Sequence, residues 1–340
     1  MENYLEYHYK KYPKSEVQDY IKLVYQTTFG TEHMISDPTK SLSYLKEEIS
    51  NLSHVEFYED LYDYISNDYI RVNLRVYKQY NLNVNILNET FINTSQIFID
   101  NDKTFIGELS LLKKFLIKNG HAVGELDYYY ESIKDNNYHS VHHSQTYHRN
   151  YAPAYRVIHQ KFLNEELRYY QVRHFLDSFD KSKINFFALE GKTTSGKGEI
   201  SNLLLKDNDV TVIHTKDFYD SSDNETGINS LRLIKEIINP AVLNKQLKYK
   251  RYNSSSKTFE EVIIEKTCPI VVIEGVYSSN PMLEEYYKGV IYLHINEDLR
   301  QDRLLMKPRL LLSKFIGEWI PKENNYYSKY NPFKRADIIV

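Results

Sequence analysis

The segment from Leu189 to Ile200, LEGKTTSGKGEI, carries the residues whose spacing points most directly to a chemistry. It reads Gly191-x-x-x-x-Gly196-Lys197, the spacing of a phosphate-binding loop. Glycines in such a loop let backbone N–H groups turn toward phosphate oxygens, and the positive end of the following helix adds to the attraction. Lys197 would then reach the outer phosphates. The residues expected to bind the nucleotide are Gly191, Thr194, Ser195, Gly196, Lys197, Gly198 and Glu199.

The position after the lysine departs from the usual pattern. Most phosphate loops place a serine or threonine there to hold magnesium, and this chain has Gly198. At this point the loop resembles those of the adenylate kinase and UMP-CMP kinase families, which read Gly-Lys-Gly and hold the metal through water and acidic residues. Those families continue with threonine, whereas this chain has Glu199. Three interpretations stay open: Glu199 contacts the metal, it marks weakened catalysis, or it points away along the helix.

The elements around the loop predict an α/β domain. Short apolar runs, FFALE, VTVIHT, PIVVIEG and GVIYLHI, alternate with helical stretches such as EISNLLLK and SLRLIKEIINPAVLNKQL. Such alternation is typical of a doubly wound parallel sheet, here a P-loop NTPase fold, with the loop between the first strand and its helix. The polar joint DKSKIN separates this region from the first half. We therefore expect a mainly α-helical domain over residues 1–178 and a kinase domain over residues 179–340.

The run HTKDFYD follows the second expected strand. Here the chain resembles the uridine kinase and phosphoribulokinase family, which places an aspartate and an aromatic pair after this strand. The resemblance implies that Asp217 accepts the proton of the attacking hydroxyl, with Phe218 and Tyr219 beside the acceptor. The chemistry agrees, because in-line phosphoryl transfer needs an oriented hydroxyl and a carboxylate to take its proton. A helix-cap or turn role for Asp217 is the alternative.

Two further segments extend this resemblance. The run PIVVIEG ends in Glu274, and the carboxyl end of a strand lies at the ligand edge of such a sheet. Glu274 is thus expected to hold magnesium through water or to position the acceptor, with a turn cap as the alternative. The segment LKYKRYNSSSKTFEE has the place of the family's substrate-side segment. Arg251 and Tyr252 are therefore candidates for acceptor contact, with a solvated basic hairpin as the alternative.

The segment QDRLLMKPRLLLSKF falls where the family has a lid that closes over the transferring phosphoryl group. Lid cations stabilise the charge on the phosphoryl oxygens. The cations available are Arg300, Arg303, Lys307 and Arg309. Arg303 is the catalytic candidate, and Pro308 predicts a break in the lid helix. The tail ends in ADIIV, like the last strand of similar kinases, so the resemblance covers residues 184–340. It implies ATP and Mg²⁺ as cofactors, and it leaves the acceptor unidentified.

The first half reads as helices, and it resembles the uncharacterised N-terminal extensions of uridine-kinase-like proteins in Firmicutes. Apolar residues with helical spacing mark SEVQDYIKLVYQTTFG, DPTKSLSYLKEEISNL and FIGELSLLKKFLIKNG. YIRVNLRVY fits a strand or a helix. The stretch from Tyr155 to Leu176 is expected to form one helix, with Val157 and Ile158 in a core.

Histidines gather in the first half. FGTEHMISD holds Glu32 and His33. NYHSVHHSQTYHRNYAPAYRVIH holds His139, His142, His143, His148 and His159, with Arg149, Tyr151, Tyr155 and Arg156. Three interpretations stay open: a zinc or iron site, a site for an anionic or polar ligand that uses the arginines and imidazoles, or a polar loop without chemistry of its own.

Composition bounds the remaining functions. With 340 residues and 41% hydrophobic residues, the chain is long enough for two packed domains. The formal charge of −3 gives no global argument for a nucleic-acid or membrane partner, so we expect a small-molecule acceptor. One cysteine, Cys268, and a start without an apolar signal core favour the cytoplasm. Similar kinases often assemble, which allows a homo-oligomer.

The function expected from these patterns is an ATP-dependent small-molecule kinase. Two other functions stay open: a nucleotide-gated regulatory protein with a weakened phosphate loop, and a bifunctional protein with a separate histidine-rich site in its first half.

Overall fold

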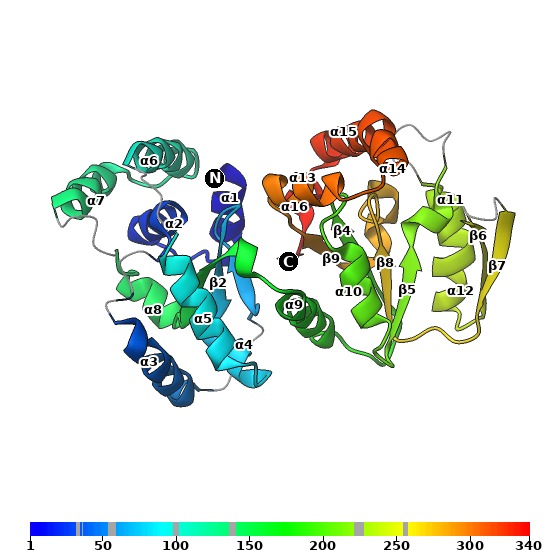
Figure 1. Ribbon diagram of the computed structural model, residues 1–340, viewed down its shortest axis with the longest axis horizontal. Helices are drawn as coiled ribbons and strands as arrows, with labels where there is room; N and C mark the ends of the chain where they lie inside the picture. Colours follow the sequence, from blue (N-terminus) through cyan, green and yellow to red (C-terminus); the bar gives the residue numbers. More distant parts are fainter. Residues whose placement is uncertain are drawn as a thin grey trace. The chain divides into compact units, whose positions relative to one another are not determined.

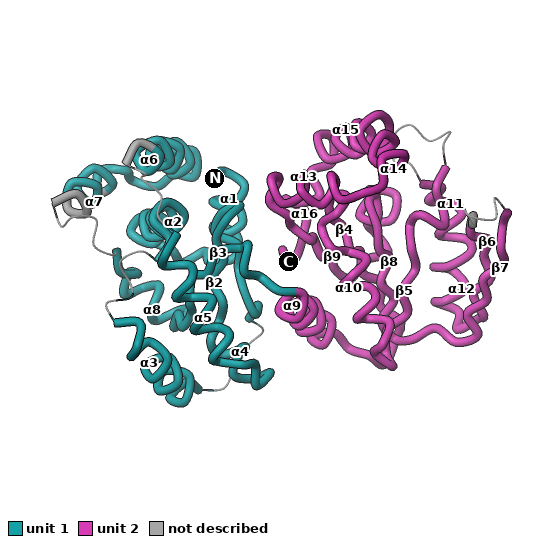
Figure 2. Tube along the Cα trace, in the orientation of Figure 1, with its two compact units in different colours: residues 1–164 teal, residues 165–340 magenta. Residues whose placement is uncertain are grey.

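A computed structural model describes residues 1–31, 35, 37–53, 59–97, 102–135, 141–220, 228–253 and 258–340. It divides into two compact units, unit 1 over Met1–Asn164 and unit 2 over Glu165–Val340 (Figure 2). Within the described residues, no helix is long and apolar enough to cross a membrane.

Unit 1 is mainly helical and also contains a small antiparallel sheet, in the strand order β1-β2-β3 (Figure 1). Its elements are α1 (Glu2–Lys11), α2 (Val17–Phe29), α3 (Pro38–Asn51), β1 (Tyr62–Tyr64), β2 (Tyr69–Asn73), α4 (Leu74–Gln79), α5 (Val84–Ser95), α6 (Asp102–Lys118), α7 (Gly124–Asp135), α8 (Gln145–Tyr151), β3 (Tyr155–His159) and η1 (Gln160–Phe162). The three helices expected from apolar spacing are α2, α3 and α6.

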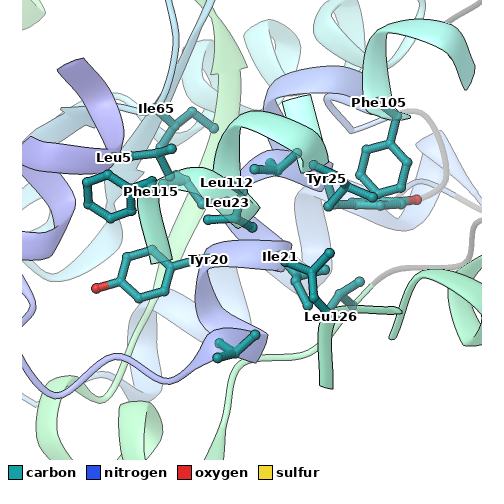
Figure 3. Packing of buried hydrophobic residues seen from close by; sticks show 14 of the residues in the cluster. Leu5, Tyr20, Ile21, Leu23, Tyr25, Ile65, Phe105, Leu112, Phe115 and Leu126 are labelled. Carbon is teal, nitrogen blue, oxygen red and sulfur yellow. The ribbon is translucent and has the colours of Figure 1, made fainter. Parts of the chain in front are cut away.

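Helix α2 forms the centre of the unit 1 core. A capping box between Glu16 and Asp19 starts it, and nearly all of its side chains are buried. Ile21 and Leu23 pack with Leu112 and other residues of α1, α6 and α7, as Figure 3 shows. The core therefore joins helices that are far apart in the sequence.

Two stretches of unit 1 differ from a simple helical reading. The segment YIRVNLRVY forms first a strand and then a helix. Strand β2 ends at Asn73, whose side chain caps α4 by accepting from the N–H of Arg75. The expected helix from Tyr155 to Leu176 is wrong over its first turns. Residues 155–159 form β3, which pairs along its length with β2, so cross-strand pairing of Val157 and Ile158 overrides helical spacing.

Unit 2 is an α/β fold built on a five-stranded parallel sheet, in the order β10-β9-β4-β8-β5, and a separate hairpin of β6 and β7. Its elements are α9 (Glu165–Asp177), β4 (Asn185–Gly191), α10 (Lys197–Leu204), β5 (Val210–His214), η2 (Thr215–Phe218), α11 (Ser230–Leu233), η3 (Ile234–Ile238), α12 (Asn239–Val242), β6 (Leu247–Asn253), β7 (Thr258–Ile264), β8 (Ile270–Glu274), η4 (Pro281–Tyr286), β9 (Tyr287–Leu293), α13 (Glu297–Leu305), α14 (Arg309–Lys314), η5 (Phe315–Trp319), α15 (Ile320–Tyr330), α16 (Pro332–Arg335) and β10 (Ile338–Ile339). The four apolar runs are β4, β5, β8 and β9, and the ADIIV tail supplies β10, so the predicted α/β fold is confirmed.

Helix α9 belongs with unit 2, so the division between the units lies one helix before the expected boundary at residue 178. The guanidinium of Arg173 donates to Asp207 and Asp209 in the turn between α10 and β5. The ring of Phe175 lies edge-on to that of Phe187 on β4, at 6.0 Å between centroids. These contacts join α9 to the sheet.

Candidate active site

The central strand β4 carries the phosphate loop to the carboxyl edge of the parallel sheet. Strands β8 and β5 lie on one side of β4, and β9 and β10 lie on the other. The strand order therefore reverses at β4, and such a switch point is where α/β sheets bind their ligands. Residues 192–196 connect β4 to α10 at this point.

The loop backbone turns too tightly for side chains at its glycines. Gly191 has a φ of +152°, and a Cβ there would lie 2.6 Å from the carbonyl oxygen of Leu293 and 2.7 Å from Oγ of Ser195. Gly196 has a φ of +101° where it caps α10, and Thr194 has a φ of 67°. Only glycine fits at 191 without displacing its neighbours.

Lys197, the lysine of the motif, is buried beside the loop. Its ammonium donates to the carbonyl oxygens of Gly191, at 2.6 Å, and Lys192, at 2.9 Å. Burial lowers the pKa of Lys197, and surrounding carboxylates, Glu274 first among them, oppose that shift. The positive charge therefore lies against the loop backbone, where the motif requires it.

Two arginines hold the other outward carbonyl groups of the loop. Arg303 on α13 donates to the oxygen of Thr194 at 3.0 Å, and Arg168 on α9 donates to the oxygen of Ser195 at 2.9 Å. A helix leaves its first N–H groups without internal partners, so the start of α10 presents donors at the same place. Lys197, Arg303 and Arg168 together hold four carbonyl groups of the loop, and the N–H groups at the start of α10 are the donors available to an anion.

A fully buried carboxylate fixes the strand end below the loop. Glu190 accepts from the N–H groups of Gly191, at 2.9 Å, and Ser279, at 3.1 Å. It also accepts from the hydroxyls of Tyr327, at 2.9 Å, and Tyr326, at 3.3 Å, on α15. Burial raises the pKa of Glu190, and these donors oppose the shift. The end of β4 is thereby tied to α15.

A second carboxylate braces the first half of the loop. Glu323 on α15 accepts from the N–H of Thr193 at 2.9 Å and from its hydroxyl at 2.5 Å. Its other oxygen accepts from Arg300 at 3.1 Å, and both partners of this ion pair are buried. The α13 and α15 segments therefore support the loop from the same side.

Asp217 lies in η2, directly after β5, which lies beyond β8 from β4 in the sheet, and is 8% exposed. Arg232 donates to its backbone oxygen at 3.2 Å, and the hydroxyl of Tyr249 lies 3.5 Å from its Oδ2. Burial raises the pKa of Asp217, and the charges of His214, Lys216 and Arg251 oppose the shift. A carboxylate of raised pKa is a stronger base for a hydroxyl proton.

The end of β8 meets the start of η2 through a glycine. Gly275 has a φ of +141°, and a Cβ there would lie 1.9 Å from Oγ1 of Thr215, so only glycine allows this approach. Glu274 accepts from Nδ1 of His214 at 2.6 Å. Burial alone would raise the pKa of Glu274, but the His214 hydrogen bond and the Lys197 charge hold it below its ordinary value. The predicted Glu274 therefore lies at the same sheet edge as η2, as an ionised group.

The two expected acceptor aromatics have different places. Phe218 is fully buried in the core, where its ring stacks on that of Tyr249 at 5.4 Å. Its expected position beside the acceptor is thus corrected to a core position that supports η2. Tyr219 is 47% exposed, and its hydroxyl donates to Glu318 at 3.3 Å.

The substrate-side segment is the β6–β7 hairpin, the alternative left open above. Arg251 is exposed and pairs across the hairpin with Glu260 at 3.3 Å, although its charge acts on Asp217. The side chain of Tyr252 lies outside the described part of the structure. The acceptor roles of Arg251 and Tyr252 remain predictions.

The metal candidates do not form a ready-made cage. Among the residues that the structure describes, no group of three or more histidine, cysteine or acidic side chains could hold a metal ion. Glu199 is exposed on the first turn of α10, and Glu274 is bonded to His214. A Cβ on Gly198 would meet nothing within 4 Å, so the position after the lysine is open space. Magnesium commonly keeps several waters and binds through phosphates, so one or two carboxylates suffice.

The lid segment breaks where Pro308 predicted. Helix α13 ends at Leu305, and Pro308 is the residue before α14. The cations of this segment then separate: Arg300 is buried in its ion pair with Glu323, and Lys307 and Arg309 are exposed. Among the described contacts of these four cations, Arg303 is the one whose side chain donates to the phosphate loop, while the backbone oxygen of Arg300 accepts from the hydroxyl of Thr194 at 3.3 Å.

Among the described residues, the histidines of unit 1 form no metal-binding group. His33 and His139 lie outside the described residues. His142 and His148 are exposed, His159 accepts from the N–H of Lys161, and His143 is buried. The two predicted arginines also have local roles: Arg149 donates to Gln145 and Arg156 pairs with Glu48.

Several site residues were not found from the sequence. Glu190 and His214 stand within quoted segments, directly before the loop and before η2, and burial at a strand end gives them their roles. Arg168, Arg232 and Glu323 carry no local signal, because folding alone brings their helices to the loop and to η2.

Comparisons with known proteins give a distant likeness over about half of the chain. No protein family matches the sequence, and no curated protein matches it. A Bacillus stearothermophilus structure, provisionally assigned as a uridine kinase, is 19% identical, with a TM-score of 0.40 over 51% of this chain and 98% of that one. A Silicibacter structure, provisionally assigned as a fructose transport system kinase, is 15% identical, with a TM-score of 0.32 over 48% of this chain and 86% of that one.

Proposed function

We propose that unit 2 is an ATP-dependent kinase that transfers the γ-phosphoryl group to a hydroxyl of a small molecule. One observation carries the proposal: the phosphate loop, with its carbonyls bonded to three cations, follows β4, and Asp217 follows β5 at the same edge of the parallel sheet, with β8 between the two strands. A donor site and a base placed in this way match the needs of in-line phosphoryl transfer.

The loop fits the phosphates of ATP on two observations. Oγ of Ser195 is fully buried and has no hydrogen-bond partner in the described part of the chain, so it is a donor without an acceptor. A Cβ at Gly191 would lie 2.7 Å from that Oγ, so the glycine keeps the space beside the hydroxyl open. Gly191 and Gly196, together with the start of α10, would hold the phosphates, while Thr194, Gly198 and Glu199 line the approach.

In the proposed step, Asp217 accepts the proton of the acceptor hydroxyl as the hydroxyl oxygen bonds to the γ-phosphorus. The bond from that phosphorus to the β-phosphate oxygen breaks, and ADP leaves with the electron pair. Lys197 and Arg303 are placed to offset negative charge on the transferred group. Glu274 and Glu199 are the carboxylates that would hold Mg²⁺, which supplies positive charge between phosphate oxygens.

The test is a metabolite screen with the full chain. We would mix the protein with ATP, magnesium and a pool of nucleosides and other hydroxyl-bearing metabolites, and read the mixture by mass spectrometry. A metabolite that gains one phosphoryl group with the wild type and with Asp302→Asn, but not with Asp217→Ala, is the expected result. Asp302 is a suitable control because it is an exposed aspartate of α13.

Two outcomes would contradict the proposal. Phosphoryl transfer that survives both Lys197→Ala and Asp217→Ala would show that the site lies elsewhere. Nucleotide binding without any acceptor-dependent consumption of ATP would instead favour a nucleotide-gated regulatory protein, the reading to which the Gly198-Glu199 pair points.

A further inference from the structure

Unit 1 buries an arginine that forms no ion pair with a carboxylate among the described residues. Arg71 on β2 is 6% exposed. Its Nε donates to Oε1 of Gln26 at 2.9 Å, and its guanidinium lies 4.9 Å from the ring centre of Tyr155. Its Nη2 is buried without a hydrogen-bond partner among the described residues. A buried charged donor left unpaired is costly, so such a group calls for an acceptor.

The carboxylate closest in register to Arg71 is already bonded to other groups. Asp63 on β1 lies directly opposite Arg71 in the sheet. Its carboxylate, however, accepts from the ammonium of Lys11 and from the hydroxyl of Tyr12. No ion pair of the described residues includes Arg71, although the sheet register would have allowed one with Asp63.

The second nearby carboxylate is also saturated, by neutral donors. Asp19 accepts from Nδ1 of His143 at 2.8 Å, and from the N–H and hydroxyl of Ser144 at 2.9 and 2.7 Å. Because His143 donates from Nδ1, its Nε2 is free to accept from the hydroxyl of Tyr155, at 2.7 Å. The ring of His143 stacks on Tyr147 at 4.1 Å. Asp19, His143 and Tyr155 thus form a fixed line that ends at the ring beside Arg71.

A second buried cation lies in the same part of unit 1. The ammonium of Lys22 on α2 donates to the backbone oxygen of Val141 at 2.7 Å. Burial, and after it the charge of Arg71, lowers the pKa of Lys22 to about 8. Arg71 and Lys22 thus act on each other, and each donates to a neutral oxygen, while the charges of Asp63 and Asp19 favour the charged form of Arg71 and of Lys22 respectively. Tyr155 is only half-buried, so the region reaches the surface at that ring.

We propose that unit 1 binds a small molecule through an oxyanion group, a carboxylate or a phosphate, at Arg71. The guanidinium supplies Nη2, the nitrogen without a partner among the described residues, and Tyr155, fixed by His143, supplies an aromatic wall. This site is separate from the phosphate loop, and it does not depend on the kinase function proposed for unit 2. The arginine proposed to bind the ligand is therefore Arg71, and not Arg149 or Arg156, which the sequence had suggested beside the histidines.

The test monitors the NMR signal of the Arg71 side chain. We would label the full chain with ¹⁵N-arginine and assign the Nε–H signal of Arg71 by its loss in Arg71→Lys. Inorganic phosphate and succinate are titrated separately. We expect the Arg71 signal to shift to saturation with one of them, and the responding probe tells phosphate from carboxylate. Because phosphate also suits the loop of unit 2, the titration is repeated in Lys197→Ala, where the Arg71 shift should persist.

The variants separate binding from folding. Arg71→Lys should weaken the binding of the responding probe at least about tenfold, because lysine keeps the charge but loses the planar guanidinium. Arg75→Lys, on the neighbouring helix α4, should bind it as the wild type does. Tyr155→Phe, which keeps the ring, should weaken the binding of the probe by a smaller factor. This variant provides the test if Arg71→Lys fails to fold. The proposal is overturned if neither probe moves the Arg71 signal, or if Arg71→Lys binds the responding probe unchanged.

Discussion

The two units bury charged groups in different ways. In unit 2, the cations of the candidate site donate to backbone carbonyls: Lys197, Arg303 and Arg168 each hold part of one loop. In unit 1, Lys22 likewise donates to a backbone carbonyl, that of Val141, whereas Arg71 donates to the side chain of Gln26 and keeps Nη2 without a partner among the described residues. The first arrangement fixes a backbone shape for a ligand with several phosphates. The second leaves a side-chain donor for a single oxyanion.

The buried titratable groups whose pKa burial shifts also differ between the two units. Burial raises the pKa of Glu190 and Asp217 in unit 2. In unit 1, burial lowers the pKa of His143 to about 3 and that of His8 to about 4. Unit 1 thus buries neutral imidazoles, whereas unit 2 buries carboxylates whose ionised form burial disfavours.

The largest expected effect concerns the loop lysine. Lys197→Ala removes the donor to two loop carbonyls and the charge expected to meet the outer phosphates, so phosphoryl transfer should fall by about 10²- to 10³-fold. Steady-state kinetics with the acceptor found in the screen would measure it. Lys206→Ala, an exposed lysine just after α10, is the control and should keep wild-type rates. Equal losses in both variants would contradict a specific role for Lys197.

Acid should act mainly on unit 1. A histidine whose folded pKa lies below 6.5 contributes stability that is complete above that value and is lost as the pH falls toward the folded pKa. A buried carboxyl group with a raised pKa has the opposite effect: as the pH falls, its protonation removes the cost of burying a charge and so stabilises the fold. Between neutral pH and about pH 5, amide exchange read by mass spectrometry should therefore quicken in unit 1 before unit 2.

A histidine variant sharpens this comparison. His143→Gln removes the titrating ring, so the acid response of unit 1 should become shallower, even if the variant is less stable at neutral pH. An acid response that is the same in wild type and variant, or that starts in unit 2, would show that buried imidazoles do not set it.

The lid arginine should have an intermediate effect. Arg303 donates to the oxygen of Thr194, and Arg303→Ala should lower kcat by about tenfold to a hundredfold through loss of a charge beside the transferred group. Arg303→Lys should recover part of the loss, since it keeps the charge. An unchanged kcat in Arg303→Ala would make this arginine a structural support of the loop.

The smallest expected effect tests the missing hydroxyl. A Cβ at Gly198 meets nothing within 4 Å, so Gly198→Ser adds a hydroxyl without displacing any neighbour. We expect the magnesium concentration for half-maximal rate to fall a few-fold, since that hydroxyl is the usual metal contact. Gly198→Ala is the control for the gain in helix propensity. A serine variant that matches the alanine variant would show that the metal is held elsewhere.

Local patterns were enough for much of unit 2. Short apolar runs between helical stretches predicted β4, β5, β8 and β9, and glycine spacing placed the loop after β4. Pro308 marked a helix break because proline cannot continue a helix. These features depend on neighbours in the sequence, so the sequence by itself determined them.

Only the tertiary structure decided which side chains meet. Phe218 and Tyr219 are adjacent in the sequence, yet packing buries one and exposes the other. Residues 155–159 became a strand because β2 was there to pair with them. Arg168, Glu323 and Arg71 have no local signal, because their partners lie on other elements. Burial and pairing depend on contacts between distant segments, and the spacing of residues along one segment does not contain them.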